Sequence, residues 1–216
     1  MLRAPATGQF FQTSLPLADA TFNKFKTWLP STSMSPGRQQ EFLAGRLCAY
    51  EAAKLLDIEL GSLPSGLKRE PLWPSSLVGS ISHTKELAVA WVDLKSQSLS
   101  LGVDVENLIS EEKYRELAKQ VASNEEIQLL DSQESPSLNF TLLFSAKEAL
   151  FKALYPLCHH YIDFKEVEWL GVDGENWEIR LTSTRSEIKS LNRVYRGQWQ
   201  KSQGLVMTSI RLGLDF

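Results

Sequence analysis

The stretch LGVDVEN, residues 101–107, alternates apolar and acidic residues in the pattern of a short β-strand. Side chains of a strand point alternately to its two faces, so Val103 and Val105 share one face and Asp104 and Glu106 share the other, with alpha carbons roughly 6.6 Å apart. Two carboxylates held this close repel each other unless a cation lies between them or one of them stays protonated. The pattern therefore indicates a metal site, although an antiparallel strand with a solvated polar face would alternate in the same way.

The composition is that of a soluble globular protein. The chain has 216 residues, of which 43% are hydrophobic and 23% charged, and its net charge is −3. This length allows one large domain or two small halves around a core. No run of Lys and Arg is long enough to hold nucleic acid or a membrane surface, so any anion site must be local.

The cysteines and the apolar runs bear on the cellular compartment. Cys48 and Cys158 lack metal-type spacing, and we expect both to be reduced, as in a cytoplasmic protein. The start MLRAPATGQFF has no apolar core of signal-peptide length, and no apolar run approaches the roughly 20 residues that span a bilayer. The sequence predicts a soluble, cytoplasmic monomer without a membrane span.

The expected elements occur in a repeated order, a helix followed by strands. RQQEFLAGRLCAYEAAKLL (38–56) predicts a helix, and LVGSIS (77–82), LAVAWVDL (87–94) and LSLGVDVE (99–106) predict a small antiparallel sheet. Residues 111–130 then look helical, residues 139–155 predict a helix that ends before Pro156, and four strand-like segments follow.

These elements predict an α+β fold built from two similar halves, residues 1–107 and 108–216, each with a long helix on a small antiparallel sheet. A weak internal sequence similarity supports the repeat, because an alignment of FLAGRLCAYEA with FSAKEALFKAL pairs Phe42 with Phe144 and Arg46 with Glu148. We therefore expect a pseudo-twofold arrangement with the functional cleft between the halves.

A third acid lies in the second of these helices. Its helix places Phe144, Glu148 and Lys152 at i, i+4 and i+8, so the three side chains share one side of the helix. A surface ion pair between Glu148 and Lys152 would show the same spacing. Together with the two strand acids, however, Glu148 completes an oxygen-only ligand set of the kind that Mg²⁺ prefers, with waters and substrate phosphates filling the shell. A nearby ammonium can neutralise a phosphoryl group or protonate a departing oxygen.

The two motifs, Gly102-Val-Asp104-Val-Glu106 and Phe144-Ser-Ala-Lys147-Glu148-Ala149-Leu-Phe-Lys152, resemble the signatures of the Sfp-type 4′-phosphopantetheinyl transferases, particularly the enterobactin-synthetase branch. Their order and their separation of about forty residues are also similar. GSISHT, LAGRLCA and KREPLWP resemble further family segments, so that the resemblance covers roughly residues 38–155.

The resemblance implies Mg²⁺-dependent transfer of the phosphopantetheine arm of coenzyme A, the co-substrate, to a serine of an apo carrier protein, with release of adenosine 3′,5′-bisphosphate. Asp104, Glu106 and Glu148 would bind the metal, and Glu148 or a water would also take the serine proton. Lys152 would act on the leaving group, and Glu125 would be a further catalytic acid. The implied ligands of coenzyme A are Arg46, Lys68, Arg69, Ser82, His83, Asp104 and Lys152.

Several readings stay open at this level. Lys68 and Arg69 are equally well explained as solvated loop charges, and Glu125 as part of a solvated helix face. The same acids would also suit a Mg²⁺-dependent hydrolase of coenzyme A or a related nucleotide, and the fold would suit a noncatalytic carrier-binding module. The carrier itself could belong to a peptide, polyketide or fatty acid synthase, with the branch resemblance favouring siderophore biosynthesis.

Overall fold

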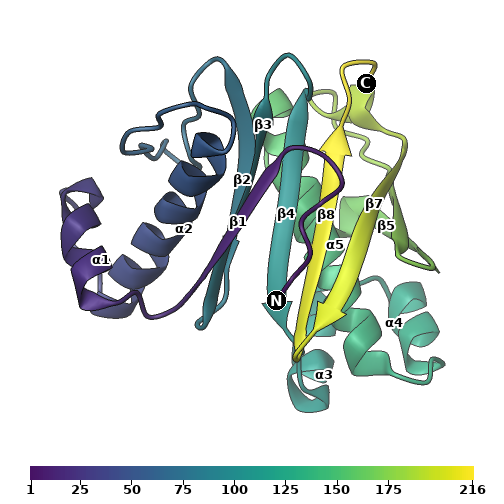
Figure 1. Ribbon diagram of the computed structural model, residues 1–216. Coiled ribbons are helices and arrows are strands. Elements are labelled where there is room, and N and C mark those ends of the chain that lie inside the picture. The colour runs from purple at the N-terminus through teal and green to yellow at the C-terminus, as the bar shows by residue number, and fades with distance from the viewer. The chain divides into compact units, whose positions relative to one another are not determined.

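The computed structural model describes all 216 residues and confirms the α+β class, with helices and two antiparallel sheets (Figure 1). The chain divides into two compact units. The N-terminal unit comprises Ala4–Val103 and Leu212–Phe216, and the C-terminal unit comprises Met1–Arg3 and Asp104–Arg211. The pseudo-twofold relation and the domain division at residues 107 and 108 remain predictions.

The sheet of the N-terminal unit has the strand order β1-β3-β2, formed by β1 (Gln9–Ser14), β2 (Leu77–His83) and β3 (Leu87–Leu94). The predicted strands 77–82 and 87–94 are confirmed. The expectation that LSLGVDVE completes this sheet is wrong, because β4 (Ser100–Asn107) belongs to the other sheet and β1 pairs with β3 instead. The pattern of β1, QFFQTS, is too short to distinguish a strand from a loop before its partner is known.

The predicted first helix is confirmed as α2 (Pro36–Lys54), which packs on this sheet (Figure 1). Ser35 caps it by accepting a hydrogen bond from the backbone N–H of Arg38 at 3.4 Å. Gly45 lies where the helix approaches the sheet, since a Cβ there would come within 2.8 Å of Ile81 Cγ2. The glycine that weakens the helix therefore permits its close packing.

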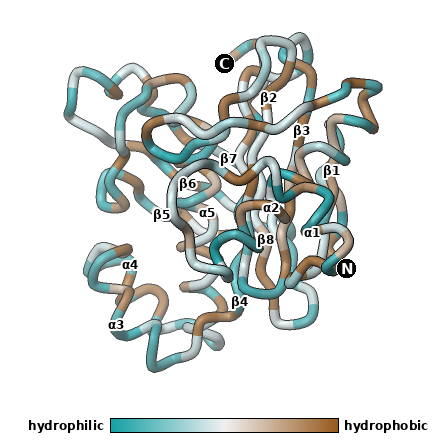
Figure 2. The backbone as a smooth tube through the Cα atoms, turned by 90° about the vertical axis from the view of Figure 1, so that its left-hand side faces the viewer, coloured by the Kyte–Doolittle hydropathy of each residue, from teal (hydrophilic) through white to brown (hydrophobic).

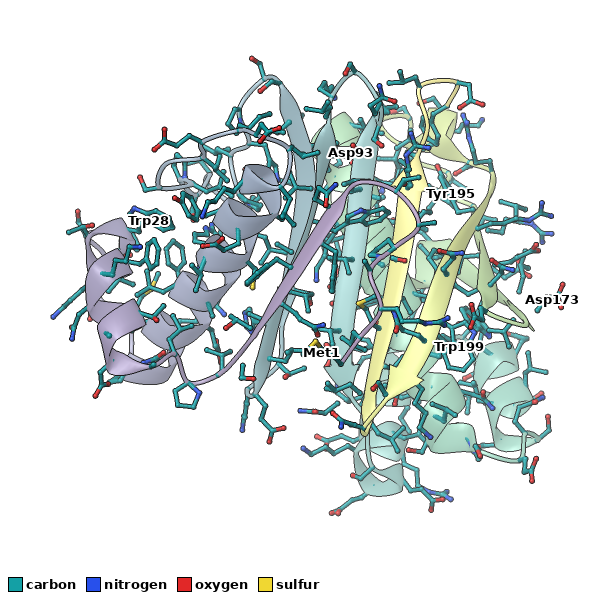
Figure 3. All side chains as sticks on the ribbon, in the orientation of Figure 1. Met1, Trp28, Asp93, Asp173, Tyr195 and Trp199 are labelled. Carbon is teal, nitrogen blue, oxygen red and sulfur yellow. The ribbon has the colours of Figure 1, made fainter.

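A short helical segment covers the other side of α2. It consists of α1 (Asp19–Phe25) and the 3₁₀ turn η1 (Lys26–Trp28). Trp28, labelled in Figure 3, has its ring centroid 4.5 Å from that of Phe25 and 5.7 Å from that of Tyr50 on α2. Such tilted and edge-on contacts add to the burial of the three rings.

The second sheet has the order β4-β8-β7-β6-β5. Its remaining strands, β5 (Val167–Asp173), β6 (Asn176–Leu181), β7 (Val194–Ser202) and β8 (Leu205–Leu212), confirm the four strands predicted after the second helix. The 3₁₀ turn η2 (Phe164–Glu166) precedes β5, and a second 3₁₀ turn, η3 (Lys189–Leu191), lies between β6 and β7. Gly197 lets the buried Trp177 ring lie against β7, where a Cβ would collide with that ring and with the carbonyl of Ser209.

The helical stretch predicted over residues 111–130 is two helices, α3 (Glu111–Val121) and α4 (Asn124–Asp131). Ala122 is extended, with φ −118° and ψ 151°, and Ser123 begins α4 through a capping box with Glu126. Figure 2 shows hydrophobic and hydrophilic stretches alternating along both helices, as expected of helices with one buried face.

The long helix of the C-terminal unit is α5 (Pro136–Cys158), which lies along the five-stranded sheet (Figure 1). Ser145 joins it to β8 through a hydrogen bond of 2.9 Å between its hydroxyl and that of Thr208. The predicted end before Pro156 is wrong. The helix continues past Pro156 to Cys158, because the proline removes only its own backbone hydrogen bond and the preceding turns remain packed, and His159 then ends it in a left-handed conformation with φ 54°.

Both cysteines are free. Cys48 is buried within α2, and this burial raises the pKa of its thiol to about 12. No helix combines the length and the apolar character that crossing a bilayer requires.

Candidate functional site

The acidic residues of the two motifs meet in the C-terminal unit. Asp104 and Glu106 lie at the end of β4, and Glu148 and Lys152 lie one turn apart on α5. The Lys152 ammonium donates a hydrogen bond of 2.7 Å to Asp104 Oδ1, and the Asp104 side chain is only 4% exposed. The helix stripe is therefore directed at the strand, which a surface pair between Glu148 and Lys152 would not require.

The carboxylates of this cluster perturb one another. Burial, followed by the negative charge of Asp104, raises the pKa of Glu106 to about 8, with a further increase from Glu148 and an opposing effect of Lys152. Burial also raises the pKa of Glu148, where Lys152 opposes the shift and Asp104 adds to it. Three carboxylates thus share one ammonium, and the cluster favours a further positive charge.

The donor set suits a hard cation. In the present side-chain arrangement no three His, Cys, Asp or Glu residues are grouped closely enough to hold a metal ion. Asp104, Glu106 and Glu148 nevertheless offer only carboxylate oxygens, which is the chemistry that Mg²⁺ selects and that zinc or copper sites rarely use alone. The donor chemistry of these three residues therefore fits such an ion.

A small cavity of about 50 Å³ lies beside Glu148. Its walls include Phe151 on α5 and the segment from Tyr161 to Phe164. The ring centroids of Phe151 and Tyr161 are 5.7 Å apart. Its lining surface is mostly apolar, so the structure presents a small, largely apolar recess next to one acid of the cluster.

A basic group occupies the N-terminal unit, where sequence reasoning had placed phosphate ligands. Arg46 is buried in α2. Its Nε donates to the carbonyl of Leu63 at 3.2 Å, and its Nη2 donates to Ser65 Oγ at 2.8 Å. The guanidinium carbon of Arg46 lies 4.3 Å from the centroid of the Phe42 ring. Burial, followed by the positive charge of Arg38, lowers the pKa of Arg46 to about 10. Two arginines close enough to repel each other favour a bound anion.

His83 extends this basic group at the end of β2. Its Nε2 lies 2.9 Å from Nη1 of Arg38, which also pairs with Glu41 at 2.9 Å. A guanidinium can only donate, so Nε2 is the acceptor in this contact. Ser82 precedes His83 on the same strand and is buried.

Sequence reasoning missed Arg38. It lies 45 residues from His83, and no local pattern distinguishes it from a solvated charge in the first turn of a helix. Only the packing of α2 on the sheet brings the two side chains together.

Lys68 and Arg69 lie in an exposed loop closed by a bridge between Ser65 and Pro71. The backbone N–H of Lys68 donates to Glu70 Oε2 at 2.8 Å, and Arg69 has φ 68°. Because Arg46 binds Ser65, the buried guanidinium also holds one end of this loop. Both loop side chains are solvated, so ligand and surface charge remain equally compatible with their positions.

Glu125 is not brought to the acid cluster. It lies exposed in the first turn of α4, where its own backbone N–H and the hydroxyl of Ser123 lower the pKa of its carboxyl. The neighbouring Glu126 is buried instead and pairs with Lys147 at 2.9 Å. Sequence reasoning assigned no role to this pair, although Ser123-Asn-Glu-Glu126 matches the capping-box pattern that places Glu126 at the start of a helix. The catalytic role predicted for Glu125 has no support in this geometry.

Family comparisons agree with the two motifs. Residues 31–93 match the 4′-phosphopantetheinyl transferase N-terminal domain, and residues 100–207 match the 4′-phosphopantetheinyl transferase superfamily. The chain belongs to the 4′-phosphopantetheinyl transferase superfamily. The resemblance inferred from the strand and helix motifs is thereby confirmed.

Individual relatives support the same membership. Enterobactin synthase component D of Salmonella typhi is 39% identical over 132 residues, which are 58% of this chain and 54% of that protein, so the match spans about half of the relative. 4′-Phosphopantetheinyl transferase Svp of Streptomyces mobaraensis is 33% identical over 81% of this chain and 72% of its own length. Enterobactin synthase component D of Escherichia coli K12 is 30% identical over 84% of this chain and 82% of its own length.

Proposed function

We propose that this chain transfers the 4′-phosphopantetheine arm of coenzyme A to a serine of an apo carrier protein. The observation that carries the proposal is the cluster of Asp104, Glu106, Glu148 and Lys152, in which residues from the two family motifs come together. The names of the relatives point the same way, since they include a 4′-phosphopantetheinyl transferase and enterobactin synthase components.

Mg²⁺ is the proposed cofactor, held by Asp104, Glu106 and Glu148. When bound, it would neutralise part of the pyrophosphate charge of coenzyme A. Glu148, directly or through a water, takes the proton of the carrier serine as the serine oxygen attacks the phosphorus that bears the pantetheine arm. The bond from that phosphorus to the departing phosphate oxygen breaks, and Lys152 stabilises the negative charge on the adenosine 3′,5′-bisphosphate that leaves.

The basic group of the N-terminal unit is proposed to bind the nucleotide phosphates. The group contains the guanidinium groups of Arg38 and Arg46 and the imidazole of His83. Ser82 adds a hydroxyl from the same strand as His83. Guanidinium groups form strong charge-assisted hydrogen bonds to phosphate oxygens. Lys68 and Arg69 are weaker candidates because their loop leaves them in solvent.

The names of the similar proteins favour a carrier protein of siderophore peptide synthesis, and the protein is proposed to act as a cytoplasmic monomer.

The two halves, 1–107 and 108–216, are proposed to be related by a pseudo-twofold axis. Nothing in the activity depends on this symmetry, so it is tested separately by comparison of the two halves in an experimental structure.

The function is tested by incubating the purified chain with a folded apo peptidyl carrier domain, coenzyme A and Mg²⁺. We expect the carrier to gain the mass of one phosphopantetheine on a single serine and adenosine 3′,5′-bisphosphate to appear in equal amount. Free phosphopantetheine with an unmodified carrier would indicate a hydrolase. Carrier binding without either product would indicate a noncatalytic module.

The phosphate assignment is tested by replacing Arg38 with Gln, which removes the charge and keeps a polar side chain. We expect coenzyme A to bind at least tenfold more weakly, because charge-assisted hydrogen bonds to the ligand are lost. Isothermal titration of coenzyme A measures the change. The matched control is Arg180→Gln, which removes an exposed arginine that pairs with Glu168 at 2.8 Å. Equal affinities in the wild type and Arg38→Gln would contradict the assignment.

A further inference from the structure

Lys147 belongs to the α5 motif, yet its ammonium is fully engaged away from the acid cluster. Nζ donates to the carbonyl of Val121 at 3.0 Å, to Glu126 Oε2 at 2.9 Å and to the carbonyl of Phe164 at 3.1 Å. The side chain is 1% exposed. An ammonium has three hydrogens, so these three acceptors satisfy it and leave none for a substrate.

Glu126 is the other half of this buried ion pair. Its Oε1 accepts a hydrogen bond from the backbone N–H of Trp169 at 2.6 Å, and its Oε2 accepts one from the N–H of Ser123 at 2.8 Å. The pair therefore joins the end of α3, the start of α4, η2 and β5 to α5. Figure 1 shows α3 and α4 gathered beside α5. A buried pair with this many partners fixes the relative positions of the segments that supply them.

Lys147 also lines the recess at Glu148. Lys147 directly precedes Glu148, so their side chains leave the helix about 100° apart. The segment from Tyr161 to Phe164 forms one wall of the recess, and the Lys147 ammonium donates to the carbonyl of Phe164, the last residue of this segment. One lysine thus ties the helix that carries Glu148 to this wall of the recess.

We propose that Lys147 is a positioning residue, which through Glu126 and the carbonyl of Phe164 holds the 161–164 wall against α5 and so orients the Glu148 carboxylate. The inference rests on the proposed function for its catalytic consequence. Its structural part, the placement of the wall, stands independently of that function.

A double substitution separates positioning from simple stabilisation. Lys147→Met alone leaves the Glu126 carboxylate buried without its cation, so the midpoint of thermal unfolding should fall markedly. Lys147→Met combined with Glu126→Gln removes both charges, and the Gln oxygen can still accept from the N–H of Trp169. We expect the double variant to recover most of the melting temperature that the single variant loses.

The recovered double variant gives the decisive measurements. We expect its kcat for carrier modification to stay at least tenfold below that of the wild type, with KM for coenzyme A within about threefold. In hydrogen exchange, amides of residues 161–164 should exchange at least tenfold faster, whereas those of β6 should be unchanged. The control Ser145→Ala removes the bond between α5 and β8 and should lower the melting temperature while leaving both kcat and the exchange of the wall as in the wild type.

Wild-type kcat together with wild-type exchange of residues 161–164 in the double variant would overturn the proposal, since Lys147 would then only stabilise the fold. Faster exchange of the wall with wild-type kcat would overturn its catalytic consequence. If the wild-type chain modifies no carrier, the proposed function fails. Hydrogen exchange still decides in that case whether Lys147 holds the wall.

Discussion

Asp104→Asn should reduce kcat/KM for carrier modification by roughly 10³-fold, because the asparagine keeps the shape of the side chain and removes a charge that a cation and Lys152 both need. The structure makes this residue central, since it is buried and its Oδ1 binds the Lys152 ammonium at 2.7 Å. The variant should still fold, and its free energy of unfolding should fall by about 1 kcal/mol, because one ion pair with a partly exposed lysine contributes about that much. Thermal unfolding and Mn²⁺ titration are measured on the same sample as activity.

The control for this substitution is Asp93→Asn in the N-terminal unit. Asp93 is also a buried aspartate, and it accepts hydrogen bonds from the N–H of Leu94 at 2.8 Å and from Ser98 Oγ at 2.5 Å (Figure 3). We expect it to cost stability and to leave turnover unchanged. An Asp104→Asn enzyme with wild-type kcat/KM and wild-type dependence on Mg²⁺ would show that the metal assignment is wrong.

Lys152→Met should have two opposite effects. In the absence of coenzyme A, Mn²⁺ should bind several-fold more tightly, because the ammonium no longer occupies Asp104 Oδ1 or repels the incoming cation. Carrier modification should nevertheless become roughly 10²-fold slower, because the charge on the departing oxygen loses its neutralising partner. Electron paramagnetic resonance of free Mn²⁺ measures the first effect, and the mass of the carrier measures the second.

Lys119→Met is the matched control, because Lys119 lies exposed on α3 and the same charge is removed there. It should change neither measurement. If Mn²⁺ bound more weakly to Lys152→Met, the lysine would organise the carboxylates for the metal and would not compete with it. If turnover were unchanged, Lys152 would have no part in stabilising the leaving group.

Local patterns were sufficient wherever one element carries its own signal. The alternation of β4 and the length and apolar content of α2 and α5 predicted these elements within a few residues of their bounds. Errors occurred where a local signal was read too strictly. A proline removes one backbone hydrogen bond and need not end a helix, as Pro156 in α5 shows, and Ser123 with Glu126 marks a helix start inside a stretch that otherwise looks continuous.

The sequence by itself determined the family and the identity of the acidic residues, because motifs a few residues long specify which side chains share a strand face or a helix side. Only the tertiary structure decided their partners. Lys152 meets Asp104 across 48 residues, Arg38 meets His83 across 45, and Lys147 meets Glu126 across 21. Helix and strand periods set the direction of a side chain, whereas the packing of distant segments sets what it meets. For the same reason β1, and not β4, completes the first sheet: strand pairing is selected by closure of the whole fold.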